Sequence, residues 1–334
     1  MVWYFLALGW VYFLIYRLRF IPLALLGFCA MPLVMFATFR GSSGKDSELY
    51  LHRFYSFDSD GYVFNFFDEP VLNFLIYVSR SVSDSHELFY FLHAIIVCTL
   101  FCLALKRFDS GRLYFFSVAP MFLVDGLTNG MRVTLAYHFF LVAVVYRREI
   151  LVFPAVFLSH VSGALLYITR MFPDYVGRSK ARLLYVIPFF AFAGVAIYMG
   201  VEYLSALSPR ISGKLSKYGG MVLATKYSGI ADITVLFSLF VCVALGPVSY
   251  LKRFFYVLSG LVCCLAFYFL IQQSLAFIRI LKLVLLGLML SGTFVMGCSK
   301  GKEWVVVVVG YLYTLNFVRQ ILTDPGFLPY PGEL

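Results

Sequence analysis

Two ionisable side chains lie inside hydrophobic sequence, where a lipid-facing segment should carry none. Arg132 follows Asn129-Gly130 at the start of one apolar run, and His160 lies within the next, in Ser159-His160-Val161-Ser162-Gly163. An ionisable residue within a membrane segment marks a functional site by default, because burying it in lipid is costly. The ordinary alternatives are an arginine that snorkels to the interface and a histidine that hydrogen-bonds a neighbouring helix. We expect chemistry at both positions.

Other arginines lie near the outer ends of apolar runs or in a cationic loop. Arg40 closes the second run. Arg279 lies one turn into a later run, with Lys282 on the same helical face. Converging guanidinium groups grip a phosphate or pyrophosphate through paired hydrogen bonds, and their charge does not titrate away. The predicted ligand is a lipid-linked pyrophosphate, and the predicted pyrophosphate-binding residues are Arg40, Arg132, Arg210 and Arg279.

Acidic residues gather between Asp46 and Glu87. Asp46 and Glu69 flank the loop and are placed to act as a general base or to orient sugar hydroxyls. Asp58-Ser59-Asp60 has the form of a pair that holds a divalent metal on a sugar diphosphate, but so short a match is common by chance. The chain has no zinc spacing, glycine-rich phosphate loop or Ser-His-Asp order. We therefore predict no metal site and no cofactor.

The composition of the whole chain is typical of a membrane protein. Of the 334 residues, 62% are hydrophobic and 13% are charged, whereas soluble domains contain roughly 45 to 50% apolar residues. Apolar windows of about 20 residues recur, which predicts helices rather than barrel strands. The predicted fold class is all-α, a polytopic integral membrane protein with a single transmembrane domain, 1–334. The ten candidate spans are 2–16, 20–39, 86–105, 113–126, 130–146, 183–204, 231–250, 256–272, 275–297 and 304–321.

Segment 150–169 decides the predicted topology. If it crossed the bilayer once, the cations between 170 and 182 and those of later inner loops would lie outside, against the positive-inside rule. A re-entrant pair of half-helices with a break near His160 keeps all of them inside. Irregular backbone at membrane depth is tolerated only beside protein or a watery cavity. We therefore predict a dip with His160 at a cavity. The net charge of +10 follows from cations that flank spans, so no nucleic-acid partner is expected.

This topology leaves two external loops, 40–85 and 205–229. Apolar residues recur at helical spacing over 71–81, too short a stretch to span, so we expect an interfacial helix there. The second loop contains four cations and no acid. It is either a flap over an anionic ligand or a loop against lipid headgroups. Tyr50 and other aromatic residues of the first loop are candidates to stack on sugar rings.

Three short motifs resemble those of the EpsG and Wzy group of bacterial polysaccharide polymerases. Arg40, Gly44-Lys45-Asp46 and Tyr50 resemble an Arg, a Gly-x-Asp and a Tyr that follow the second span in that group. Arg132-Val133-Thr134-Leu135-Ala136 resembles its Arg-Gln-x-x-Ala element, with valine in place of glutamine. Leu158-Ser159-His160-Val161-Ser162 resembles its Phe-His-x-Ser element, with serine before the histidine where phenylalanine is common.

The resemblance implies polymerisation of undecaprenyl-pyrophosphate-linked oligosaccharide repeats, for O-antigen or exopolysaccharide, on the outer face of the bacterial inner membrane. It also implies a GT-C-like arrangement of helices and, as a candidate partner, a chain-length regulator of the Wzz type. Arg132 and Arg279, helped by Arg40 and Arg210, would bind the pyrophosphate and stabilise it as it leaves. His160 or Asp46 would accept the proton of the attacking hydroxyl.

Two other classes of protein compete with this interpretation. A flippase for lipid-linked glycans would need a path to the inner face, yet no cation is placed in the inner half of any candidate span. A glycosyltransferase that uses a polyprenyl-phosphate sugar would need a metal on Asp58 and Asp60, and a chelator would abolish its activity.

Overall fold

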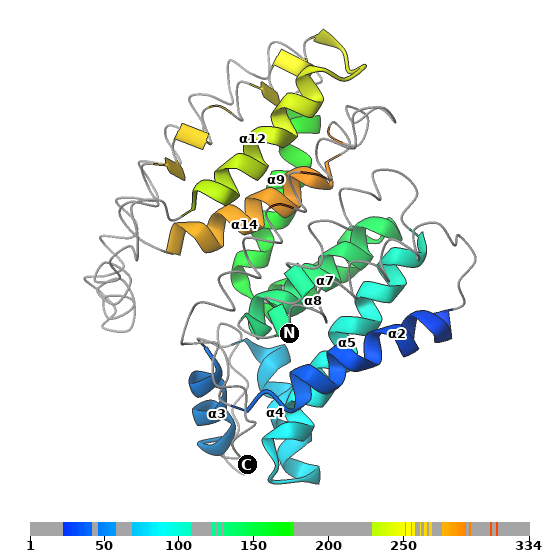
Figure 1. Cartoon of the computed structure of the whole chain (residues 1–334), viewed down its shortest axis with the longest axis vertical. Coiled ribbons are helices and arrows are strands. Elements are labelled where there is room, and N and C mark those ends of the chain that lie inside the picture. The colour runs from blue at the N-terminus through cyan, green and yellow to red at the C-terminus, as the bar shows by residue number, and fades with distance from the viewer. Residues whose placement is uncertain are drawn as a thin grey trace. The chain divides into compact units, whose positions relative to one another are not determined.

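The computed structural model is helical throughout the part of the chain that it describes, with no strand there (Figure 1). The all-α prediction is confirmed for these residues. They are 23–41, 46–57, 69–107, 122–123, 126–127, 130–176, 229–250, 252–254, 256–257, 261, 264–265, 267–268, 276–291, 294, 308 and 312.

Five of the predicted spans correspond to helices. They are α2 (Leu23–Thr38), α5 (His86–Arg107), α7 (Met131–Val145), α12 (Ile230–Ala244) and α14 (Ala276–Met289). Among the described residues, α5 is long and apolar enough to cross a membrane, whereas α7 and α12 are shorter apolar helices. The 22 residues of α5 rise about 33 Å at 1.5 Å per residue, enough for the hydrocarbon layer. The number of spans and the GT-C-like arrangement stay predictions. The spans 2–16 and 183–204 lie outside the described residues, and 113–126, 256–272 and 304–321 do so for the most part.

The chain divides into two compact units, which are described separately. Unit 1 contains Met1–Ala164 and Gly310–Leu334, and unit 2 contains Leu165–Val309. In unit 1, α5 packs against α2, α4 (Pro70–Val82) and α7, and α7 packs against α8 (Glu149–Ser159). Their contacts bury large apolar side chains completely, among them Phe89, Leu135 and Phe140. The expectation of a single transmembrane domain stays a prediction.

Two helices lie within the first predicted external loop. The sequence did not predict α3 (Ser47–Tyr55), which buries Tyr50 and Phe54, one helical turn apart. The helix expected over 71–81 is α4, and its location at a membrane interface stays a prediction. Pro70 opens α4, where its fixed φ suits a helix and its missing N–H costs nothing. Both helices therefore bury an apolar face against the rest of unit 1.

A break in the helical backbone lies at His160, as the sequence predicted. Helix α8 ends at Ser159, His160 is extended with φ −162° and ψ 125°, and a 3-10 turn follows at Val161–Gly163. A Cβ on Gly163 would lie 2.7 Å from Val156 Cγ1 and 3.4 Å from Ala136 Cβ. Glycine therefore lets this turn approach α8 and α7 closely. That the break dips into a membrane stays a prediction.

Unit 2 contains α9 (Ala164–Val176), apart from its first residue, together with α12 and α14. The C-terminal end of α14 receives side-chain hydrogen bonds. Arg170 Nε donates to the carbonyl of Leu290 at 3.2 Å, and the Tyr256 hydroxyl donates to that of Leu288 at 3.2 Å. These bonds satisfy carbonyl groups that a helix end leaves without partners.

Candidate functional site

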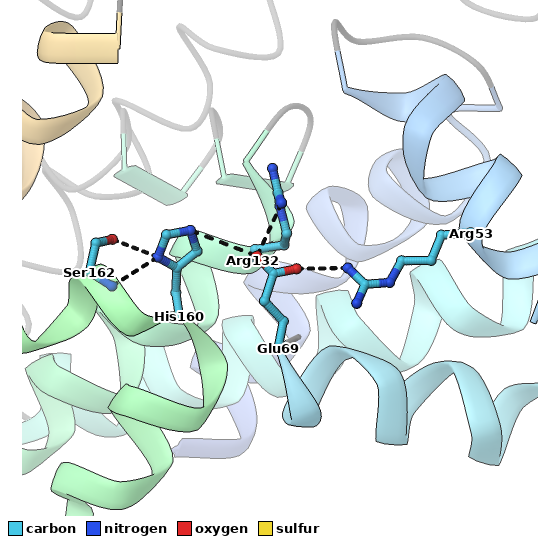
Figure 2. Close-up of polar contacts among 5 residues, drawn as sticks. All are labelled: Arg53, Glu69, Arg132, His160 and Ser162. Atoms are coloured by element: carbon cyan, nitrogen blue, oxygen red, sulfur yellow. Dashed lines mark hydrogen bonds and ion pairs between the residues drawn. The ribbon is translucent and has the colours of Figure 1, made fainter. Parts of the chain in front are cut away.

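Three cationic or titratable side chains from separate elements of unit 1 converge on the carboxylate of Glu69 (Figure 2). Arg53 Nη1, from α3, lies 2.7 Å from Oε2. Arg132 Nη1, from the first turn of α7, lies 3.0 Å from Oε1. His160 Nε2 lies 3.8 Å from the same Oε1. One carboxylate on the N-terminal side of α4 thus joins α3, α7 and the break after α8.

The backbone of Glu69 has a left-handed conformation, with φ 56° and ψ 62°. Such a conformation costs a non-glycine residue on the order of 1–3 kcal/mol and persists only where the surroundings hold it. Arg147 is the other non-glycine with positive φ among the described residues. Strained backbone concentrates at functional sites. The strain and the converging cations therefore single out the same residue.

The hydrogen bonds of His160 define which ring nitrogen carries hydrogen. The backbone N–H of Ser162 donates to Nδ1 at 3.3 Å, and Ser162 Oγ lies 2.5 Å from the same nitrogen. Since a backbone N–H can only donate, Nδ1 accepts and the neutral ring carries its hydrogen on Nε2. His160 therefore directs an N–H donor toward Glu69.

Tyr50 and Asp46 lie on the α3 side of the same cluster. Tyr50 is 1% exposed, and the guanidinium carbon of Arg132 lies 5.9 Å from its ring centroid. Burial raises the pKa of the Tyr50 hydroxyl, although the charge and hydrogen bond of Arg132 oppose this rise. The Asp46 charge acts on both Tyr50 and Arg132. Asp46 is thus close enough to contribute to the field of the site.

Arg40 is buried among protein groups, with 1% of its surface exposed. Its guanidinium group donates to the carbonyl of Leu127 and to Met131 Sδ, the latter at 2.9 Å, and lies 4.2 Å from the Tyr90 ring centroid. His93 Nε2 also bonds the Met131 carbonyl, at 3.0 Å. These contacts favour a positioning role for Arg40 at the start of α7. Its role as a pyrophosphate ligand stays a prediction.

The model of the EpsG family matches residues 23–331. The chain belongs to the EpsG family. No curated protein and no solved structure matched it. The match confirms the resemblance found from the short motifs. With the apolar helix α5, it indicates a membrane protein with a function of the polysaccharide polymerase type, whose substrates are lipid-linked glycans.

In this EpsG-family protein, the structure brings together most of the residues that the sequence singled out. Those around the cluster are Asp46, Tyr50, Glu69, Arg132 and His160. Arg40 lies at the margin of the cluster, with its guanidinium carbon 6.0 Å from the centroid of the Tyr50 ring. Arg279 lies in α14, but its side chain is outside the described residues, as is the whole of Arg210.

Sequence reasoning missed Arg53 and Ser162 as members of the site. No motif singled out Arg53, and α3 was not predicted. Had the helix been recognised, the three-residue spacing of Tyr50 and Arg53 would have placed them on one face. Ser162 belonged to the motif that contains His160, but no pattern distinguished its hydroxyl from an ordinary loop serine.

The described residues contain no group of three or more His, Cys, Asp or Glu side chains able to hold a metal. Asp58 and Asp60 lie outside the described residues. The prediction that the protein needs no metal therefore stays a prediction.

Proposed function

We propose that this protein joins undecaprenyl-pyrophosphate-linked oligosaccharide repeats by glycosyl transfer on the outer face of the bacterial inner membrane. The observation that carries the proposal is the position of Arg132. Its guanidinium group lies beside a histidine N–H donor and a second arginine, at a part-exposed site in an EpsG-family chain. Paired guanidinium groups match the oxygens of a pyrophosphate in charge and geometry.

In the proposed reaction, the bond between the donor's anomeric carbon and its phosphate oxygen breaks as the acceptor hydroxyl attacks that carbon. The electron pair leaves with undecaprenyl pyrophosphate, and the hydroxyl proton passes to Asp46. Arg132, with Arg279, Arg40 and Arg210 as further candidates, stabilises the leaving charge. His160 Nε2–H faces the carboxylate of Glu69 at 3.8 Å. Tyr50 and Glu69 are the proposed substrate contacts. A well-aimed donor contributes about 3–4 kcal/mol to such a step.

The test is reconstitution in liposomes with a lipid-pyrophosphate repeat unit, followed by gel analysis of product length. The wild-type protein is expected to produce a ladder. Arg132→Ala should lower the polymerisation rate by about 10²–10³-fold while the protein elutes from size exclusion as the wild type does. The matched control is Arg80→Ala, because Arg80 pairs with Asp84 at 3.0 Å outside the cluster and its loss should leave the ladder intact.

Two outcomes would overturn the proposal. One is transbilayer movement of the lipid with no ladder for any repeat unit, which would support a flippase. The other is a ladder that chelator abolishes, which would support a metal-dependent glycosyltransferase that uses a polyprenyl-phosphate sugar. Full activity of both Arg132→Ala and Arg279→Ala would remove the proposed pyrophosphate site.

A further inference from the structure

Arg53 and Arg132 share one internal anion. Each uses its Nη1 and each binds a different oxygen of Glu69, at 2.7 and 3.0 Å. The two guanidinium groups come from different helices, α3 and α7, and are held apart by the width of a carboxylate. This is the arrangement in which two cations bind a bidentate anion.

A phosphate oxygen pair has the same sign of charge and the same acceptor character as the Glu69 carboxylate. The arginine side chains are 21% and 23% exposed, whereas Glu69 is 12% exposed. The cations are thus more accessible than the anion that binds them. Both arginine side chains thus retain exposed surface while they bind Glu69.

We infer that Arg132 and Arg53 together form a site for the phosphate oxygens of the donor. Glu69 is an internal anion that competes with the donor for this site. When the donor binds, its pyrophosphate takes the place of the Glu69 carboxylate on Arg53 and Arg132. The inference rests on the proposed function for its ligand, and it adds a residue, Arg53, and an exchange step.

Exchange is favoured over simple addition by the burial of these groups. A partly buried charge is costly to leave unpaired, and an exchange keeps an anion on each guanidinium group throughout. The released carboxylate also has a partner nearby, because His160 Nε2 lies 3.8 Å from Oε1. Donor binding would thus transfer Glu69 from the arginines to His160.

The strained backbone of Glu69 is a second observation that points the same way. A left-handed non-glycine residue is retained only while its contacts hold it, and the contacts of Glu69 include the two ion pairs as well as the Asn73 N–H that its carbonyl accepts at 3.1 Å. Once the arginines take another anion, the segment can relax. Relief of this strain would favour release of the carboxylate.

The deciding experiment measures binding of inorganic pyrophosphate to the full-length protein in detergent by isothermal titration calorimetry. An internal competitor that holds the site in about nine of ten molecules reduces the apparent affinity about tenfold. Glu69→Gln should therefore bind pyrophosphate up to about tenfold more tightly than the wild type. Glu48→Gln, an exposed glutamate of α3, removes the same charge outside the cluster and should change the affinity much less.

The same affinity in Glu69→Gln and the wild type, or a weaker affinity in Glu69→Gln, overturns the inference. Glu69→Asp is the second variant, in case the glutamine protein does not fold. Its shorter carboxylate reaches the arginines less well, so tighter binding than the wild type supports the exchange and equal or weaker binding opposes it. Arg53→Ala should weaken binding, whereas Arg80→Ala should not. If Arg53→Ala and Arg80→Ala changed the affinity for pyrophosphate equally, Arg53 would be excluded as a pyrophosphate ligand.

These results separate the inference from the proposed function. Tighter pyrophosphate binding by Glu69→Gln, together with no polymer ladder from the wild-type protein, would retain the exchange and reject the polymerase. If the wild type makes a ladder and Glu69→Gln binds pyrophosphate no more tightly than the wild type does, the proposed polymerase function is retained and the exchange is rejected.

Discussion

The orientation of the His160 ring bears on which residue accepts the proton of the attacking hydroxyl. From the sequence, both His160 and Asp46 were candidates, and Asp46 was preferred because a histidine at a helix break could equally bind the pyrophosphate. The Ser162 N–H occupies the lone pair of Nδ1, so the neutral ring offers a hydrogen at Nε2 and no acceptor there. Tyr50 is a poor base as well, because burial raises the pKa of its hydroxyl and the group stays protonated at neutral pH. These observations argue against His160 and Tyr50 as bases, and Asp46 stays the proposed base.

Substitution of the two candidates should separate their roles. Loss of a general base costs about 10²–10⁴-fold in rate, whereas loss of a neutral hydrogen bond costs about 1 kcal/mol, or roughly fivefold. Asp46→Asn should therefore lower the rate of ladder formation far more than His160→Gln, whose amide N–H can replace Nε2–H. The measurement is the initial rate in liposomes at saturating donor, across a range of pH.

The reverse order would contradict this assignment. If His160→Gln abolished polymerisation and Asp46→Asn kept most of it, the histidine would be the base and its ring would have to reorient during the reaction. Glu48→Gln serves as the control, since this exposed residue of α3 lies outside the cluster and its loss should leave the pH profile unchanged.

At the scale of elements, the start of α7 is held by buried polar side chains of α5 and of the segment after α2. Arg40 bonds the Leu127 carbonyl and Met131 Sδ, and His93 bonds the Met131 carbonyl. Arg132 is the next residue of α7. The direction of its guanidinium group toward Glu69 thus depends on the buried contacts of Arg40 and His93.

Arg40→Lys tests this positioning role. A lysine lacks the planar fork of arginine, so it cannot serve Leu127 and Met131 together, and a buried carbonyl left unpaired costs about 1–3 kcal/mol. We expect a lower apparent melting temperature in detergent and weaker pyrophosphate binding. Arg107→Lys, an exposed arginine at the end of α5, should change neither. If Arg40 were itself a pyrophosphate ligand, Arg40→Lys would weaken binding with an unchanged melting temperature.

The sequence predicted the helices with continuous apolar runs better than the contacts between them. Hydrophobic runs located α5 and α7. The positive-inside rule led to the break at His160, because a single crossing by segment 150–169 would have put several groups of cations on the outer side. Helix α3 was missed, since its short run of mixed polar and aromatic residues has no strong period. The burial of Arg40 against Tyr90 and Met131 was not predicted, because residue type alone predicts exposure for an arginine. The approach of Arg53 to Glu69 depends on how α3 and α4 pack, which no local pattern records.

At the scale of the whole molecule, the proposed outward-facing site requires a defined orientation of α5. Asp84 precedes this helix, Tyr90 and His93 lie in its first two turns, and Lys106 and Arg107 lie in its last turn. The candidate site therefore shares one end of α5 with Asp84, and the paired cations share the other. The positive-inside rule predicts that the cationic end faces the cytoplasm.

Cysteine labelling of membrane vesicles tests this orientation. The Asp84 side chain is 92% exposed, so Asp84→Cys should react with a membrane-impermeant maleimide in right-side-out vesicles. Arg148→Cys, at an exposed position directly before α8, should react in inverted vesicles instead. The unsubstituted protein is the control for the native cysteines, of which Cys98, Cys102 and Cys242 are buried. Labelling in the opposite pattern would place the Glu69 cluster on the cytoplasmic side, where polymerisation on the outer face could not occur. Such a result would overturn the proposed location even if the purified protein made polymer.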